Sequence, residues 1–178
     1  MIFRNWKIYN AKNITFLFLV GFCFNIQSCK VSYSFTGANI GSAETFQVNF
    51  FQNNAQLIEP GIDIQFTNAL YDIIANQTSL KPTDNGGDLV YEGEIVEYRI
   101  APMTATADQR AAQNRLTISV NVRFFNKTDE EQDFEQRFSF FFDYDANAQL
   151  SGSVRDSALD VIYERITQDI FQKSLANW

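Results

Sequence analysis

Histidine is absent from the 178-residue sequence, and cysteine occurs only at positions 23 and 29. Histidine is the side chain most often used as a general base and as a metal ligand, so its absence removes the commonest basis for both kinds of site. Two cysteines cannot build a cysteine-rich zinc site or a disulfide framework. The sequence also lacks an apolar run of about 20 residues, the length that a transmembrane helix needs.

The first 28 residues have the three parts of a secretory signal. Arg4, Lys7 and Lys12 form a basic start without an acidic residue, and residues 14–24 (ITFLFLVGFCF) form an apolar run of eleven. The following IQSC at 26–29 resembles the lipobox of bacterial lipoproteins, in which the cysteine is lipidated and becomes the first mature residue. The alternatives are an ordinary secretory signal and an uncleaved anchor, and the short apolar run argues against the second.

Lipidation at Cys29 sets the expected organisation of the chain. We expect a signal peptide at 1–28, a lipidated tether at 29–44 and one α+β domain at 45–178. Two acyl chains are enough for stable membrane anchoring. Many inner-membrane lipoproteins carry aspartate directly after the lipidated cysteine, where this chain has Lys30. We therefore expect the protein on the periplasmic face of the outer membrane.

The expected mature chain is strongly acidic. The whole sequence has 14 basic and 21 acidic residues, and the signal peptide removes three of the basic ones. This leaves 11 basic against 21 acidic residues, a net charge of −10. Such a charge without a local basic patch argues against a nucleic-acid partner.

The apolar pattern alternates between strand and helix periods. Period-two alternation indicates strands, and a stripe at helical spacing indicates amphipathic helices. In chain order we expect a strand, a helix, three strands and a helix at residues 45–51, 60–76, 89–100, 115–125, 132–144 and 149–175. This β-α-β-β-β-α order predicts an α+β two-layer sandwich, with one four-stranded mixed sheet and both helices on one face.

The connections refine this expectation. A right-handed crossover through the first helix makes the first two strands parallel. A short polar connection makes the last two strands an antiparallel hairpin. The polar positions of the strands then form a second sheet face that is solvated or faces a polar partner. Residues 101–114 read as a long polar loop, and loops of that length are usually functional.

Three patterns suggest chemistry and have simpler interpretations. Glu92, Glu94 and Glu97 resemble paired carboxylates but fit a solvated strand face. Asp143-Tyr-Asp-Ala-Asn opens like a calcium loop but lacks the later glycine and glutamate. Asn85-Gly-Gly lacks the helix and lysine of a phosphate loop. We therefore expect no catalytic residue, no metal, no cofactor and no enzymatic activity.

The basic residues are few, and four of them lie near the predicted loops. Arg99, Arg110 and Arg115 flank or occupy the 101–114 loop, and Lys127 lies in the next connection. They are candidates for contact with an anionic ligand such as a lipid phosphate, and ordinary surface charge is the alternative. If the second and third strands are antiparallel, Lys127 lies at the opposite end of the sheet from the loop.

Four segments carry a resemblance to a known family. They are CKVSYSFTG from Cys29, NRLTI from Asn114, DFEQ from Asp133 with the later DYD, and DIFQ from Asp169 with the terminal ANW. Together with the lipobox and the order of elements, they resemble the LptE-type lipopolysaccharide-assembly lipoproteins of Gram-negative bacteria. The resemblance covers residues 29–178.

The resemblance implies a structural role in envelope biogenesis. Members of the family plug an LptD-type outer-membrane β-barrel, in a 1:1 pair, and help it to insert lipopolysaccharide into the outer membrane. The basic residues that would touch lipopolysaccharide phosphates are here Arg99, Arg110, Arg115 or Lys127. A free-standing periplasmic lipoprotein that binds a lipid or another ligand is the alternative function, and it predicts a cavity between helices and sheet.

Overall fold

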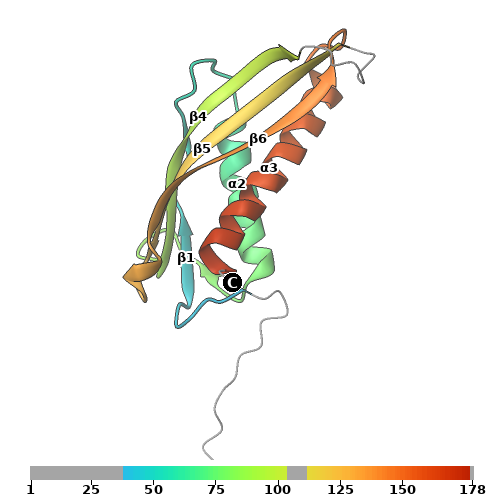
Figure 1. Cartoon of the computed structure of the whole chain (residues 1–178). Helices are drawn as coiled ribbons and strands as arrows, with labels where there is room; N and C mark the ends of the chain where they lie inside the picture. The colour runs from blue at the N-terminus through green and yellow to red at the C-terminus, as the bar shows by residue number, and fades with distance from the viewer. Residues whose placement is uncertain (1–37, 104–111, 177–178) are drawn as a thin grey trace, which may run out of the picture. The chain divides into compact units, whose positions relative to one another are not determined.

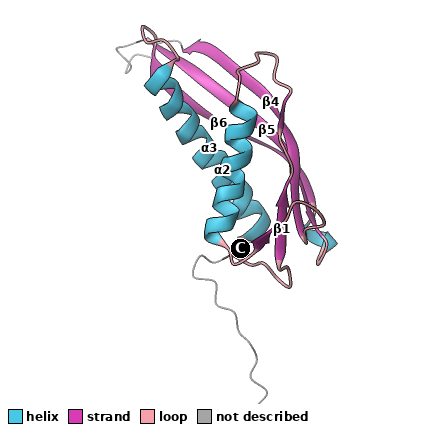
Figure 2. Ribbon diagram, turned by 180° about the vertical axis from the view of Figure 1, so that it is seen from behind, coloured by secondary structure: helices cyan, strands magenta, loops and turns pink. Residues whose placement is uncertain are grey.

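Two helices lie side by side on one face of a mixed β-sheet in the computed structural model, which describes residues 38–103 and 112–176 (Figures 1 and 2). The long strands are β4, β5 and β6, and the helices are α2 and α3. The elements in chain order are β1 (Thr45–Val48), β2 (Gln52–Asn53), α2 (Ile62–Gln77), β3 (Lys81–Pro82), β4 (Leu89–Met103), β5 (Gln113–Asn126), the 3₁₀ turn η1 (Glu130–Gln132), β6 (Phe134–Asp145) and α3 (Gly152–Leu175).

The topology confirms the predicted α+β sandwich. The sheet order is β3-β1-β4-β5-β6, and β2 pairs with β4 beyond the end of β1. β1 and β4 are parallel, as the crossover through α2 requires, while β4, β5 and β6 form an antiparallel meander. The sheet has six strands instead of the predicted four because β2 and β3 have two residues each, too few to produce a period-two pattern.

The core lies between the helices and the sheet. The alternating apolar residues of β5 are fully buried, as predicted: Leu116, Ile118, Val120, Val122 and Phe124. The apolar stripes of the two helices cover them: Ile62, Phe66, Leu70 and Ile74 from α2, and Ala158, Ile162, Ile166 and Ile170 from α3. Two tyrosine hydroxyls join the layers, because Tyr163 donates to the Ile62 carbonyl and Tyr91 donates to Ser174.

Two apolar residues expected inside the core are exposed. Phe50 was predicted to share a face with Phe46, but its exposed fraction is 53% and Phe51 is buried instead. β1 ends at Val48, and the Phe51 N–H is bonded to the Thr67 hydroxyl of α2, so the alternation of β1 does not continue. Val161 of α3 is 41% exposed, since it lies beside the buried stripe rather than within it.

The predicted loop at 101–114 is shorter than its polar composition indicated. β4 continues through Met103 and β5 begins at Gln113, with Ala101 opposite Arg115 and Met103 opposite Gln113. The backbone ladder of an antiparallel pair holds whatever side chains it carries, so polar residues can extend it. The remainder of that loop, residues 104–111, lies outside the described residues.

Candidate functional site

The side chains of β4, β5 and β6 that point away from the helices form the surface that we call the polar face. Strand register sets its composition, because Glu92 lies opposite Arg123, Arg99 opposite Thr117 and Arg115 opposite Asp143. Its members are Glu92, Glu94, Glu97 and Arg99 from β4, Arg115, Thr117, Ser119, Asn121 and Arg123 from β5, and Glu135, Arg137, Ser139, Phe141 and Asp143 from β6. This confirms the predicted second face of polar residues.

A β-bulge brings Glu97 onto this face. Glu92 and Glu94 are two apart and share a side of the strand, whereas strict alternation would turn Glu97 toward the helices. The register of β4 against β5 shifts between Ile95 and Glu97, so one residue is left without a partner and the alternation changes phase. Glu97 then lies opposite Ser119, and Tyr98 takes the buried position.

Glu97 is the centre of a network that spans three strands. Its carboxylate accepts hydrogen bonds from Arg99 Nε at 2.8 Å, from Arg137 Nη2 at 2.6 Å and from the Ser119 hydroxyl at 2.7 Å. Ser119 is fully buried and lies 2.9 Å from the Ser139 hydroxyl. The bonds from Arg99 and then Ser119 hold the pKa of Glu97 below its usual value. The carboxylate therefore stays ionised and fixes two arginine side chains against the sheet.

Arg115 is held equally firmly at the next level of the face. Its Nε and Nη2 donate to the two carboxylate oxygens of Asp143 at 2.7 and 2.8 Å, a bidentate geometry. Its guanidinium carbon lies 3.6 Å from the centroid of the Phe141 ring, a cation–π contact. The hydrogen bonds from Arg115 lower the pKa of Asp143. The side chain is thus fixed both in the sheet direction and against an aromatic surface.

The fourth arginine of the face is also paired. Arg123 Nε donates to Glu92 at 3.0 Å, and Asn49 donates to the other oxygen of the same carboxylate at 3.3 Å. All four arginines of the polar face therefore have an acidic partner on the same face. Glu94 and Glu135 form no ion pair among the described residues, so the face keeps an excess of negative charge.

The structure places the predicted anion-contact residues in different situations. Arg99 and Arg115 lie on the polar face on neighbouring strands, and each is bonded to a carboxylate. Lys127 follows the end of β5, where its N–H donates to the Asp88 carbonyl, so it lies at the opposite end of the meander as predicted. Arg110 lies outside the described residues.

Sequence reasoning missed the acidic partners. Asp143 was considered only as the start of an incomplete calcium loop, and Arg137 and Ser119 were not singled out. Arg115 and Asp143 are 28 residues apart in the chain. Only the register of the β5–β6 hairpin brings them together, and alternation shows which face a residue occupies but not which residue lies opposite.

We expect the Glu97 network to make stability pH-dependent. A carboxyl with a lowered folded-state pKa stabilises the fold above its unfolded pKa, and this contribution is lost as the pH falls through the folded value. Glu97→Gln should therefore reduce the free energy of unfolding at pH 7, by about 1 kcal/mol because both arginines are more than half exposed. Urea unfolding at pH 7 and at pH 3 measures the difference.

The control for this prediction is Glu135→Gln, because Glu135 is exposed and forms no ion pair in the described part of the chain. The Glu97 variant should approach the wild type as the pH falls below the usual carboxyl range, and the Glu135 variant should match it throughout. An equal loss for both variants, or a Glu97 effect that does not depend on pH, contradicts the prediction.

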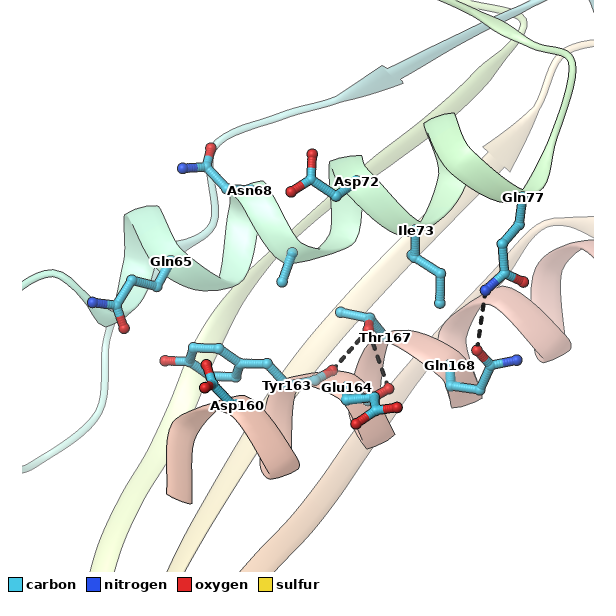
Figure 3. A pocket seen from close by; sticks show the side chains of 11 residues that line it. Gln65, Asn68, Asp72, Ile73, Gln77, Asp160, Tyr163, Glu164, Thr167 and Gln168 are labelled. Atoms are coloured by element: carbon cyan, nitrogen blue, oxygen red, sulfur yellow. Dashed lines mark hydrogen bonds between the residues drawn. The ribbon is translucent and has the colours of Figure 1, made fainter. Parts of the chain in front are cut away.

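A second hollow lies between α2 and α3 (Figure 3). It is a groove of about 660 Å³ on the side of the helices away from the sheet. Its lining includes the carboxylates of Asp72, Asp160 and Glu164 and the amides of Gln65 and Asn68. Lipid sites are mainly apolar, so this polar groove does not fit the cavity that a free-standing lipid-binding protein would need.

Other kinds of site are missing from residues 38–103 and 112–176. No group of three or more cysteine, aspartate or glutamate residues in these ranges is arranged to hold a metal ion. No helix within the same ranges is both long enough and apolar enough to cross a membrane. The polar face is therefore the most distinctive surface of the described domain.

The comparisons with known proteins agree on a family. A model of the LptE family, described as lipopolysaccharide-assembly, matches residues 43–174. No curated protein sequence matches the chain.

Two solved structures illustrate the likeness of fold. The hypothetical protein CT253 from Chlamydia trachomatis has 14% identity and a TM-score of 0.48, covering 76% of this chain and 100% of its own. The rare lipoprotein B from Shewanella oneidensis has 15% identity and a TM-score of 0.38, covering 71% and 89%. The family match extends over most of the chain, including all the described strands and nearly all of α3. The chain therefore belongs to the LptE family of lipopolysaccharide-assembly proteins.

Proposed function

We propose that this protein is an outer-membrane lipoprotein that occupies the lumen of an LptD-type β-barrel and supports lipopolysaccharide transport through it. Family membership places the chain in lipopolysaccharide assembly in the Gram-negative envelope. The barrel partner, the 1:1 ratio and the attachment of Cys29 to the periplasmic face of the outer membrane are parts of the proposal. The role is structural and needs no catalysis.

The polar face, in which each arginine is paired with a carboxylate, is the observation that carries this proposal. The interior of a large outer-membrane barrel is polar and filled with water, so a protein that fits inside needs a polar outer surface. Ion pairs that cross the strands hold the long side chains in one arrangement, which gives the surface a fixed shape. Such a surface can pack against a barrel wall with little further loss of side-chain entropy.

The same pairing limits how strongly the face can hold lipopolysaccharide. The phosphates of the glycolipid are anionic, and Arg99 and Arg115 already neutralise Glu97 and Asp143. A phosphate would have to replace one of these carboxylates. Contact through Arg99 or Arg115 is therefore proposed as a brief exchange during passage, which suits a transport path better than tight binding.

Depletion of the protein tests this function in the cell. If expression is shut off, newly made lipopolysaccharide should fail to reach the cell surface, and the surface amount should fall several-fold within a few divisions. Labelling of intact cells with a lipopolysaccharide-specific probe measures this amount. Re-expression of the wild-type chain serves as the control and should restore it. Normal surface lipopolysaccharide in depleted cells would contradict the proposed function.

A further inference from the structure

The two edges of the sheet are very different. One edge is β3, which has two residues and includes Pro82. The other is β6, which has twelve residues and pairs only with β5 among the described strands (Figure 1). β6 contains no proline, glycine or lysine, and its register against β5 has no bulge. Exposed edges normally carry such features, which prevent pairing with another chain, so β6 is an unprotected edge.

The register shows which backbone groups of β6 are open. The Ala146 N–H donates to the Ala112 carbonyl at 3.0 Å, and the same pairing continues through Tyr144 opposite Asn114. Bonded and non-bonded pairs alternate along an antiparallel ladder. The even-numbered residues of β6 therefore bond to β5, and the odd-numbered ones direct N–H and C=O outward from the edge: Glu135, Arg137, Ser139, Phe141 and Asp143. No other described residue bonds to these backbone groups.

An apolar strip accompanies the open backbone. Phe134, Phe140 and Phe142 point toward the helices but are only partly buried, whereas their neighbours on β5 are fully buried. The rings remain accessible because no strand follows β6 in the sheet. A strand added to this edge would complete the ladder and cover these rings at the same time.

Charge indicates the nature of the added strand. Glu135 and Asp145, near the two ends of β6, form no ion pair among the described residues. The arginines around them are already bonded to other carboxylates. A strand that carries lysine or arginine on the side of the polar face and apolar residues on the side of the helices would complement both surfaces.

A second copy of this chain does not fit the edge in the same way. α3 lies over β6, with Arg165 at 5.7 Å from the Phe140 ring and Lys173 at 5.8 Å from the Phe134 ring (Figure 2). Two β6 strands paired with each other would be about 4.8 Å apart. Packed helices need about 8–10 Å between their axes, so two α3 helices over the paired edges would overlap. A single strand without its own helix meets no such obstacle.

We propose that β6 binds an extended, basic, amphipathic strand of a partner protein by β-augmentation. In this mode, the backbone hydrogen bonds supply affinity and the alternating side chains supply specificity. The inference concerns how the partner is held, and it rests on the proposal that the protein works in an assembly. It does not depend on which face of the domain meets the barrel wall.

Hydrogen exchange of the full-length lipoprotein, alone and in the complex extracted from membranes, tests the inference. In the isolated protein the amides of Glu135, Arg137, Ser139, Phe141 and Asp143 should exchange rapidly. In the complex they should slow by at least about tenfold, the factor that corresponds to opening one ordinary hydrogen bond. The even-numbered amides of β6 bond to β5 and should be slow in both samples.

A pair of variants at Ser139 separates backbone pairing from side-chain contact. Ser139→Pro removes an N–H that points outward, so the fold should tolerate it, and the added strand should lose its central bond. Ser139→Ala keeps this N–H and serves as the matched control, since both variants lose the bond to Ser119. We expect the proline variant to recover at least several-fold less complex than the alanine variant at equal folded amounts.

Several results would overturn the inference. Rapid exchange of the five amides in an intact complex would do so, as would equal assembly of the proline and alanine variants. Slow exchange in the isolated protein would show that another segment of this chain or a second copy occupies the edge, and dilution distinguishes the two. If the lipoprotein is extracted without any partner, it is the proposed function that fails first.

Discussion

Replacing Gly93 with alanine is expected to destabilise the fold by about 3 kcal/mol or more, enough to reduce the folded population markedly. Gly93 lies in β4 opposite Val122, where a Cβ atom would overlap the backbone oxygen of Asn121 and lie 2.7 Å from a ring carbon of Phe51. The carbonyl cannot move without breaking the β4–β5 ladder, and Phe51 is fully buried. Urea unfolding followed by circular dichroism measures the loss.

Gly61→Ala is the matched control for this prediction. Gly61 precedes α2 with φ of 83°, and a Cβ atom there would have no neighbour within 4 Å. Alanine in this left-handed conformation costs about 1 kcal/mol without any steric overlap. A Gly93 variant that loses no more stability than the Gly61 variant would show that β4 and β5 are less closely packed than the structure indicates.

Gly93 also explains why Phe51 is buried while Phe50 is not. The sequence shows two adjacent phenylalanines after a short strand, and alternation favours Phe50. The space above Gly93 accepts the Phe51 ring, and the bond from the Phe51 N–H to Thr67 fixes the chain in that position. Both causes are contacts between segments far apart in the chain, and periodicity carries no information about them.

The parts of the fold that were predicted share one property, which is long and regular alternation. β5 and β6 alternate over more than ten residues, so their buried and polar faces follow from sequence alone. α2 and α3 have apolar stripes at helical spacing, and their bounds differ from the predicted ones by at most three residues. The α+β class then follows, because these amphipathic elements can bury their apolar faces only in two layers.

The candidate site was less predictable because it depends on register. The three glutamates of β4 were recognised, but the bulge that turns Glu97 onto the polar face leaves no simple sequence signal. The arginines Arg99 and Arg115 were selected as exposed cations for an anionic ligand. Their acidic partners become visible only when β4, β5 and β6 are aligned, and these partners change the expected role from strong phosphate binding to a neutralised surface.

Purification of the protein with its partner from membranes has the largest expected effect of all. The full-length chain is tagged after Trp178 and extracted in mild detergent. A plug that fills a barrel buries a large surface, so the complex should survive extraction. A Cys29→Ala variant, expected to lose the lipid anchor, serves as a comparison and should recover less barrel, since an anchored protein meets its partner at a higher effective concentration.

This co-purification is the most direct test of the central claim, that the domain works as a structural partner of an outer-membrane barrel. Quantification of each band gives the ratio of the two proteins. The account predicts one large β-barrel protein in a near-equal amount with the wild-type chain. Recovery of the wild-type lipoprotein alone, from membranes that contain the barrel, would contradict it.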